Sequence, residues 1–324
     1  LARVAARYAI AVTPEMAALI DAADPADPIG RQFLPHPGEL VTTAEENADP
    51  IGDHAHSPLP GLVHRYPDRV LLKLTHTCPV YCRFCFRREM VGPEGDGMMD
   101  EATLAAALAY IAARPEIFEV ILTGGDPLIL SARRVAAVTR ALAAIAHVKV
   151  LRWHSRVPVV SPARITQALV RALKSGGKAV FVAIHANHAR EFTPAAAAAI
   201  ARLAAGGIGL VSQSVMLRGV NDSVEALHAL MRAFVAHSIK PYYLHHPDLA
   251  PGTAAFRLSP VEGLALVSAL RGHLSGLAQP HYVLDLPGGH GKVPVAAGTP
   301  TDEGLLFTDR SGRRHTYPPQ PNSQ

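Results

Sequence analysis

The stretch THTCPVYCRFCFRREM, residues 75–90, holds all three cysteines of the 324-residue chain, Cys78, Cys82 and Cys85. It overlaps the end of a short apolar run, RVLLKLTH, which is typical of a β-strand, so the cysteines lie on the loop that follows this strand. Cys82 and Cys85 are too close together for an easy structural disulfide. The odd number of cysteines also favours a reducing, cytoplasmic setting.

The spacing of the cysteines, C-x3-C-x2-C, favours a metal centre, because thiolates bind zinc and iron–sulfur clusters. A closed structural zinc site needs four ligands, often in two C-x2-C pairs, and a second pair is absent from the sequence. Three cysteines on one loop can hold three irons of a [4Fe–4S] cluster and leave the fourth iron open. Two other interpretations remain: zinc completed by a histidine such as His76, and three buried apolar cysteines.

The composition predicts a globular chain with a sizeable core, since 49% of the residues are hydrophobic and 18% are charged. The net charge is +4, and the positive residues are scattered, so we expect small anionic molecules rather than nucleic acid as partners. Arg3, Arg7 and Glu15 interrupt the N-terminal apolar run, and no segment reaches the ~18 apolar residues of a membrane span. We therefore expect neither a signal peptide nor a membrane partner.

From about residue 69, β-branched apolar runs alternate with Ala- and Leu-rich helical patterns, which predicts an α/β fold. The strand candidates are RVLLKLTH, EVILTGG, VKVLRWHSR, KAVFVAIHAN, LVSQSVML and KPYYLHHPD, with HYVLDLPGG as a further run. After the second strand they recur roughly every 30 residues, the length of a βα unit in a barrel. We expect an N-terminal helical arm (1–60), a partial (β/α)6-type barrel (61–295) and a C-terminal tail (296–324). The phrase ADPIG occurs at 26–30 and 48–52 and predicts turns or helix caps.

The predicted strands end in polar residues, and the carboxyl ends of parallel strands are where α/β folds bind ligands. LTGGDPL puts Gly124, Gly125 and Asp126 at the end of the second strand, where glycines allow a backbone to approach a ligand closely. An isolated GGD is also compatible with an ordinary strand-to-helix turn. The later strand ends carry Ser155, Arg156, His185, Asn187 and Gln213, each of which could equally be a structural hydrogen-bonding residue.

The segment PGGHGKVP, residues 287–294, surrounds Lys292 with glycines, which suggests close approach of a ligand or a phosphate. It is not a Walker A motif, because the spacing differs and no Ser or Thr follows the lysine. Such a lysine can form a Schiff base with pyridoxal phosphate (PLP). The other interpretation is a surface loop.

The segment CPVYCRFC resembles the signature of the radical S-adenosylmethionine (SAM) superfamily. In that superfamily the open iron chelates SAM, and the reduced cluster splits SAM into methionine and a 5′-deoxyadenosyl radical. The resemblance implies that Cys78, Cys82 and Cys85 hold a [4Fe–4S] cluster. LTGGDPL resembles the superfamily's glycine-rich SAM motif, which implies SAM contacts at residues 124–126. The polar residues on the later strand ends would contact SAM or a second cofactor.

Four further motifs are similar to the lysine 2,3-aminomutase family: PGGHGK, RYPDRVL, QSVMLRGVND and DLAPGTAAFR. The similarity runs from about residue 25 to residue 295. It implies that Lys292 carries PLP, that Arg65, Tyr66 and Arg69 lie on the PLP side, and that Gln213 lies beside the cofactors. An arginine suits the phosphate of PLP.

The same resemblance implies an isomerase that converts L-lysine to β-lysine. Arg87 would bind the substrate α-carboxylate, and Asp248 and Asp285 would hold the lysine ε-ammonium. A glutamate mutase should lack that pair, because like charges would repel its substrate. We also expect a homodimer that receives electrons from a flavodoxin or ferredoxin.

The sequence departs from the family in several places. No cysteine follows Cys85 in this sequence, so we do not expect the C-terminal zinc segment of the longer members. His290 replaces a glycine of the family motif and His246 lies in a divergent segment, and we expect both near the substrate. Alternatives are a mutase for another amino acid and the β-lysine-forming enzyme of elongation factor P modification. A third alternative is a non-catalytic iron–sulfur or zinc protein. A fourth, an enzyme for radical SAM methylation or sulfur insertion, would leave the Lys292 motif unexplained.

Overall fold

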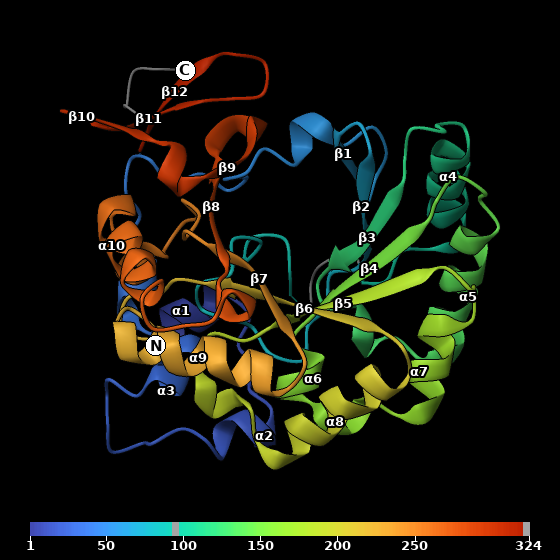
Figure 1. The fold of residues 1–324 in the computed structure, drawn as a ribbon, viewed down its shortest axis with the longest axis horizontal. Coiled ribbons are helices and arrows are strands. Elements are labelled where there is room, and N and C mark those ends of the chain that lie inside the picture. The colour runs from blue at the N-terminus through green and yellow to red at the C-terminus, as the bar shows by residue number, and fades with distance from the viewer. Residues whose placement is uncertain (93–96, 320–324) are drawn as a thin grey trace.

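A single nine-stranded sheet forms the centre of the computed structural model, which describes residues 1–92 and 97–319 (Figure 1). The strands follow one another in chain order, and neighbours from β2 to β8 are parallel. These strands are β2 (Arg69–Thr75), β3 (Glu119–Gly124), β4 (Val150–Ser155), β5 (Ala179–His185), β6 (Gly209–Val215), β7 (Lys240–His245) and β8 (His281–Leu286). Each predicted strand candidate, the further run included, coincides with one of them.

The strand centres are apolar because both faces of the parallel sheet are covered. Leu72 of β2 lies opposite Leu122 of β3, which in turn lies opposite Trp153 of β4. All three side chains are fully buried. Many of the polar residues lie at the strand ends, where the site forms, although Lys73, Arg152 and Ser212 are buried within strands.

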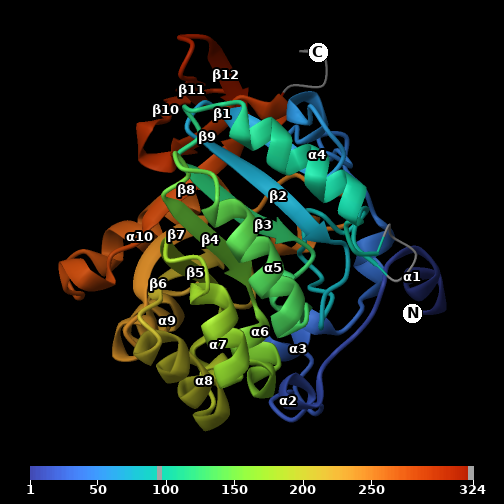
Figure 2. The same ribbon diagram turned by 90° about the vertical axis from the view of Figure 1, so that its right-hand side faces the viewer.

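Helices cover the outer face of the sheet, in front of the strands in Figure 2. Each begins after a Ser, Thr or Asp whose side chain accepts a hydrogen bond from a backbone N–H of the first turn, which stabilises the helix start. These helices and their caps are α4 (Glu101–Ala112, Asp100), α5 (Ala132–Ala143, Ser131), α7 (Gln167–Lys174, Thr166), α8 (Pro194–Ala205, Thr193), α9 (Val224–Ala236, Ser223) and α10 (Pro260–Leu270, Ser259). A short helix, α6 (Val157–Val160), follows β4.

The N-terminal segment contains only short helices, whereas the sequence suggested a longer helical lead. They are α1 (Ala2–Arg7), α2 (Pro14–Ala17), α3 (Pro28–Phe33) and the 3-10 turns at Pro37–Leu40 and His54–His56. Pro14 and Pro28 begin helices, and proline disfavours helical conformation in the residue before it, so the segment is divided. Asp27 of the first ADPIG caps α3, and Asp49 of the second starts a turn, as predicted.

Two antiparallel strands that the sequence analysis did not propose border the parallel strands. β1 (Leu62–Tyr66) pairs with β2, and β9 (Gly291–Pro294) pairs with β8. Within the described part of the chain β1 and β9 do not pair with each other, so the sheet remains an open, partial barrel.

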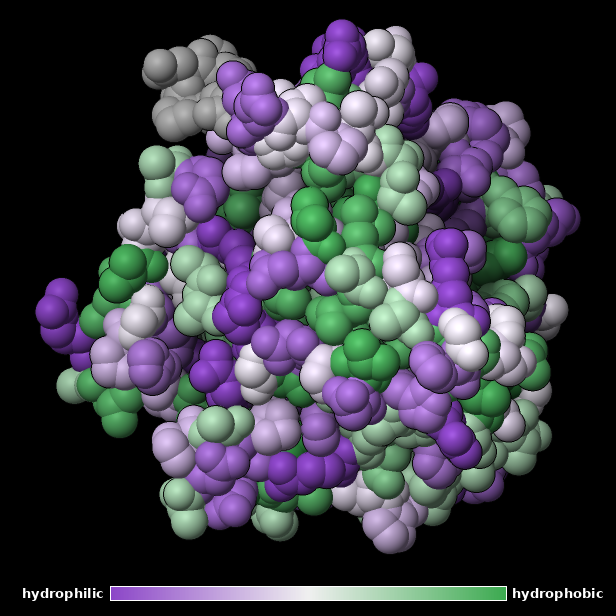
Figure 3. All heavy atoms as spheres, turned by 60° about the vertical axis from the view of Figure 1, so that its left-hand side comes forward, coloured by the Kyte–Doolittle hydropathy of each residue, from purple (hydrophilic) through white to green (hydrophobic). Residues whose placement is uncertain are grey.

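The segment after residue 295 folds as a small antiparallel sheet of β10 (Thr299–Thr301), β11 (Gly304–Thr308) and β12 (Arg314–Tyr317). Leu305, Phe307 and Tyr317 are buried and join the main hydrophobic core, which attaches this sheet beside β9 (Figure 1). On the face shown in Figure 3, apolar atoms gather near the centre among polar ones, as is common on protein surfaces. No helix in the described ranges has the length and apolar character required to span a bilayer.

Candidate active site

A cavity of about 430 Å³ lies on the inner side of the parallel strands and reaches their carboxyl ends. This volume is within the range usual for small-molecule sites. The residues that the motifs and strand ends proposed for binding the cofactors and the substrate all line it: Arg65, Tyr66, Arg69, Cys78, Cys82, Cys85, Arg87, Gly124, Gly125, Asp126, Ser155, Arg156, His185, Asn187, Gln213, Asp248, Asp285 and Lys292.

The three cysteines line one part of the cavity, on the loop after β2. Burial raises the pKa of Cys78, and it raises the pKa of Cys85 to about 11, so both are thiols at neutral pH when no metal is bound. The Arg156 guanidinium donates a hydrogen bond to Cys82 Sγ at 2.9 Å. A cation beside the sulfurs suits an anionic, thiolate-bound cluster.

The GGD segment packs against the cysteine loop. A Cβ on Gly124 would lie 2.4 Å from the Thr75 carbonyl oxygen, and one on Gly125 would lie 2.3 Å from that of Thr77. Gly124 also has φ +112°, which favours glycine. The glycines therefore allow the end of β3 to approach the backbone that leads into the cysteines.

Asp126 and Ser155 bind each other and the neighbouring backbone. Ser155 Oγ donates to Asp126 Oδ1 at 2.7 Å, and the N–H groups of Leu128, Arg156 and Val157 donate to the same carboxylate. The two residues therefore fix the end of β3 against the end of β4.

The other polar strand ends fall into two groups. Asn187 is held by protein contacts, since its amide donates to Gln32 Oε1 at 3.1 Å and its Oδ1 accepts the N–H of Val215 at 2.8 Å. Arg156 Nε, His185 Nε2 and Gln213 Oε1 are buried without a hydrogen-bond partner among the described residues. Buried polar atoms normally have partners, so these three fit a polar ligand in the cavity.

Lys292 lies on β9, directly opposite Asp285 on β8, and its ammonium forms an ion pair with Asp285 Oδ2. Its backbone N–H donates to Tyr66 Oη at 2.7 Å, and the Arg69 guanidinium lies 3.8 Å from the centre of the Tyr66 ring. Burial alone would raise the pKa of Asp285, but Lys292 and His245 hold it below its ordinary value. Asp285 is therefore ionised beside the lysine.

Asp248 lines the same part of the cavity as Asp285. Burial and the negative charge of Asp285 raise the pKa of Asp248 to about 8. Because the two carboxyl groups repel each other's negative charge, the pair retains a proton at neutral pH unless a further cation enters between them.

Asp53 is the main site residue that the sequence analysis missed. Its carboxylate accepts hydrogen bonds from Arg65 Nη2 at 3.0 Å and Arg87 Nη2 at 3.1 Å, and Lys73 Nζ lies 4.0 Å away. Asp53 is only 2% exposed. Its position after the second ADPIG turn marked it as a loop acid. The only signal in the sequence was the number of basic residues at the start of the barrel that need a counter-charge.

The two histidines expected near the substrate do not line the cavity. His246 is buried, with Nδ1 2.8 Å from Tyr282 Oη, and His290 lies beside Asp309 and His315. His245 lines the cavity instead, with Nδ1 3.8 Å from Asp285 Oδ2. Side chains alternate between the two faces of a strand, so only one of two consecutive histidines at the end of β7 can face the cavity.

The residues present fit the implied cofactors. Three thiols on one loop match the ligand set of an iron–sulfur cluster with an open iron. The unpartnered nitrogens and oxygen beside them can bind the polar groups of SAM. A lysine amine next to a carboxylate, with arginines nearby, matches a PLP site.

Comparison with known proteins identifies the class first. The family model of the radical SAM superfamily matches residues 72–231, which include the cysteine loop and the GGD segment. The chain is 42% identical over 286 residues to an L-lysine 2,3-aminomutase of Acetoanaerobium sticklandii, covering 88% of this chain and 69% of the relative. It has the same identity to that of Clostridium subterminale, with 68% of the relative covered. It is 36% identical to an L-lysine 2,3-aminomutase of Escherichia coli, of which 83% is covered.

This radical SAM chain belongs to the L-lysine 2,3-aminomutase family. The family is an isomerase family that uses a [4Fe–4S] cluster, SAM and PLP. The resemblance proposed from the motifs is thereby confirmed.

Proposed function

We propose that this chain converts L-lysine to β-lysine by moving the α-amino group to C3. The relatives described above bear the name L-lysine 2,3-aminomutase. Cys78, Cys82 and Cys85 would hold the cluster and Lys292 would hold PLP. When bound, the cluster with SAM supplies a carbon radical, and PLP carries the migrating nitrogen.

The observation that carries this proposal is the distribution of charge in the cavity. Arg87 and Arg65 share Asp53, and Asp248 and Asp285 line the cavity with Lys292. Arg65 Nη1 also lies 3.8 Å from Asp285 Oδ1 and so links the two groups. A guanidinium suits a substrate carboxylate, and a pair of acids suits a substrate ammonium. An amino acid with a positively charged side chain provides both groups.

The chain's own residues then orient and protect the substrate. Asp53 holds the Arg87 guanidinium so that less side-chain freedom is lost when a carboxylate binds. Asp285 forms an ion pair with Lys292 Nζ and so orients the amine. Once Lys292 is engaged with PLP, both acids would face the substrate ammonium. The walls of the cavity restrict water and oxygen around the reacting atoms.

A mutase for another amino acid was the main alternative, based on His246 and His290. Neither histidine lines the cavity, so this basis for a different substrate is lost. We further propose that a flavodoxin or ferredoxin supplies the electron and that the enzyme is a cytoplasmic homodimer. The three reduced cysteines, which need a reducing setting, support the cytoplasm.

The test is turnover after anaerobic reconstitution with iron, sulfide, PLP, SAM and a reductant. We expect β-lysine from L-lysine, no β-amino acid from L-glutamate, and no product from the Lys292→Ala variant at unchanged iron content. Cleavage of SAM without β-lysine would show that the cofactors are right and the substrate is wrong. Absence of both PLP and SAM cleavage would favour a non-catalytic binding protein.

A further inference from the structure

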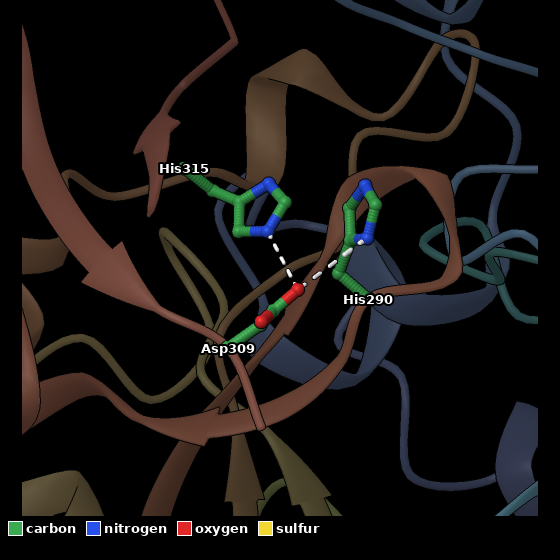
Figure 4. A group of neighbouring side chains, drawn as sticks. All are labelled: His290, Asp309 and His315. Atoms are coloured by element: carbon green, nitrogen blue, oxygen red, sulfur yellow. Dashed lines mark hydrogen bonds and ion pairs between the residues drawn. The ribbon is translucent and has the colours of Figure 1, made fainter. Parts of the chain in front are cut away.

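Three ligand side chains meet outside the cavity, between the loop that precedes Lys292 and the small C-terminal sheet. They are His290, Asp309 and His315, and one ligand atom from each lies within 4.8 Å of the others. His315 Nε2 lies 2.9 Å and His290 Nδ1 3.8 Å from Asp309 Oδ2. Figure 4 shows both imidazole rings turned toward the same carboxylate oxygen.

The backbone around His290 directs its side chain to this place. Gly288, Gly289 and Gly291 all have positive φ, between +80° and +97°, so the chain turns tightly on both sides of His290. The imidazole therefore lies beside the C-terminal sheet, with its ring centre 4.0 Å from that of His315, while Lys292 faces the cavity.

Asp309 is anchored in a way that presents one oxygen to the histidines. The N–H groups of Ser311 and Arg313 donate to its Oδ1 at 2.9 and 3.0 Å, and Ser311 Oγ donates at 2.7 Å. These contacts occupy Oδ1, so that the other carboxylate oxygen, Oδ2, points toward the two imidazole rings.

We propose that His290, Asp309 and His315 bind a divalent transition-metal ion, with zinc as the best match. Zinc takes imidazole nitrogen and carboxylate oxygen at about 2.0–2.2 Å, which puts tetrahedral ligand atoms about 3.3–3.6 Å apart. The observed separations of 2.9 and 3.8 Å from Asp309 Oδ2 lie on either side of that range.

A hydrogen-bonded cluster without metal accounts for only part of this geometry. The His315 contact is a hydrogen bond, but His290 Nδ1 at 3.8 Å is too far from the carboxylate to form one. A neutral imidazole keeps a lone pair on one of its ring nitrogens. A cation between the three groups would use that lone pair.

The cluster is accessible to an ion from solvent. The side chains of His290 and His315 are 28% and 19% exposed, whereas Asp309 is 2% exposed. This leaves a side from which a water can complete the coordination. Arg313 Nε lies 3.6 Å from Asp309 Oδ2 and competes for the same charge, but its side chain is 69% exposed and can turn away.

A metal at this position would join the C-terminal sheet, at Asp309 and His315, to the loop that precedes Lys292. The β11–β12 turn already contacts the barrel, because Arg310 Nη2 donates to the Arg65 carbonyl oxygen at 2.7 Å. The ion would therefore add a second attachment between the C-terminal sheet and the walls of the cavity.

The experiment measures zinc on the cluster-loaded protein. The reconstituted enzyme is treated with chelator and equilibrated with limiting Zn²⁺ and a competing chromophoric chelator, and bound zinc and iron are then counted. Variants are Asp309→Asn and His315→Gln, and His273→Gln, an exposed histidine elsewhere, is the matched control. We expect one zinc per chain in the wild type and the control. Zinc should bind at least a hundredfold more weakly to the Asp309→Asn and His315→Gln variants. Iron content should be equal in all four proteins, which shows that the barrel has folded.

X-ray absorption at the zinc edge locates the ion. A shell of nitrogen and oxygen without sulfur supports the proposed ligands. A sulfur shell would place the zinc on the cysteine loop and overturn the proposal. Equal zinc affinity in the wild type and His315→Gln would overturn it as well.

Discussion

At the scale of single residues, the pairing of Asp248 with Asp285 decides the charge of the site. Lys292 neutralises Asp285, whereas Asp248 has no ion-pair partner among the described residues and is held protonated by burial and by its neighbour. The pair is thus prepared for one additional cation. Under the proposed function, this additional cation is the ammonium group of the substrate side chain.

The raised pKa of Asp248 predicts a pH dependence of stability. The folded protein retains a proton up to about pH 8, whereas the unfolded chain releases it near 3.8. The wild type therefore loses stability from this group as the pH rises through that interval. Asp248→Asn cannot ionise, so its free energy of unfolding should rise relative to wild type between pH 4 and pH 8, by at most about 1.4 kcal/mol per pH unit.

Urea unfolding of the cofactor-free proteins at several pH values measures this difference. Asp302→Asn, at an exposed acid, is the control and should follow the wild type at every pH. A difference between Asp248→Asn and wild type that stays constant with pH would show that Asp248 is ionised in the folded protein.

Residue chemistry was the part of the site most accessible from the sequence. Cysteine spacing and the glycines around Lys292 point to their chemistry without knowledge of the fold, because each motif is local. Asp53 was missed because its role depends on Arg65 and Arg87, which come together with it only in the folded chain. The direction of His290 was missed because positive φ angles of the flanking glycines decide it.

At the scale of elements, the loop before Lys292 is held by close backbone contacts. Gly52 packs against it so tightly that a Cβ there would lie 2.4 Å from the Gly289 nitrogen. His56 Nε2 lies 3.0 Å from the Gly289 carbonyl oxygen. The segment before β1 therefore fixes the position of Lys292 from outside the cavity.

Gly52→Ala should destabilise the protein more than strain alone explains. A left-handed alanine costs about 1–2 kcal/mol, and forcing a methyl group into packed backbone costs about 1–3 kcal/mol more. Gly177→Ala separates the two terms, because Gly177 has φ +70° but open space around its Cβ. Chemical unfolding measures both, and PLP absorbance should fall only in Gly52→Ala. Equal losses of stability in the two variants would show that the loop yields to the methyl group.

At the scale of the whole molecule, the N-terminal segment supports the cysteine loop. The buried Glu39 carboxylate pairs with both Arg83 and Arg88 of that loop, and Arg83 Nη1 also donates to the Ala9 carbonyl oxygen at 2.8 Å. Burial alone would raise the pKa of Glu39, but hydrogen bonds from Arg83 and the His36 N–H hold it below its ordinary value. Segments about 40 residues and more apart thus share one buried ionic network.

Glu39→Gln should lower the free energy of unfolding by about 3–5 kcal/mol, because it leaves two buried guanidinium groups without their charge partner. The iron content after reconstitution should fall as well, since the cysteine loop loses its support. Glu101→Gln is the control: its side chain is 95% exposed and lies 4.0 Å from Arg134, and surface pairs contribute little. Unfolding in urea and iron analysis check both effects. A loss under 1 kcal/mol would mean that water replaces the carboxylate.

The overall architecture was predictable as far as it is periodic. The apolar runs at βα spacing predicted all the parallel strands, but they did not predict β1, β9 or the C-terminal sheet. β9 consists of only four residues, GKVP, after a glycine-rich turn. In β11 the alternation of Leu305 and Phe307 with other residues is too short to be recognised as a strand pattern. Their pairing depends on neighbours far away in the chain, which local pattern does not encode.

The β8–β9 hairpin fixes the position of Lys292 relative to the cavity. Asp285 and Lys292 are cross-strand partners, separated by the turn of residues 287–290. Side chains alternate along a strand, so adding or removing one residue in that turn would rotate Lys292 out of the cavity and away from its carboxylate. The residues of this turn can therefore be substituted more readily than their number can be changed.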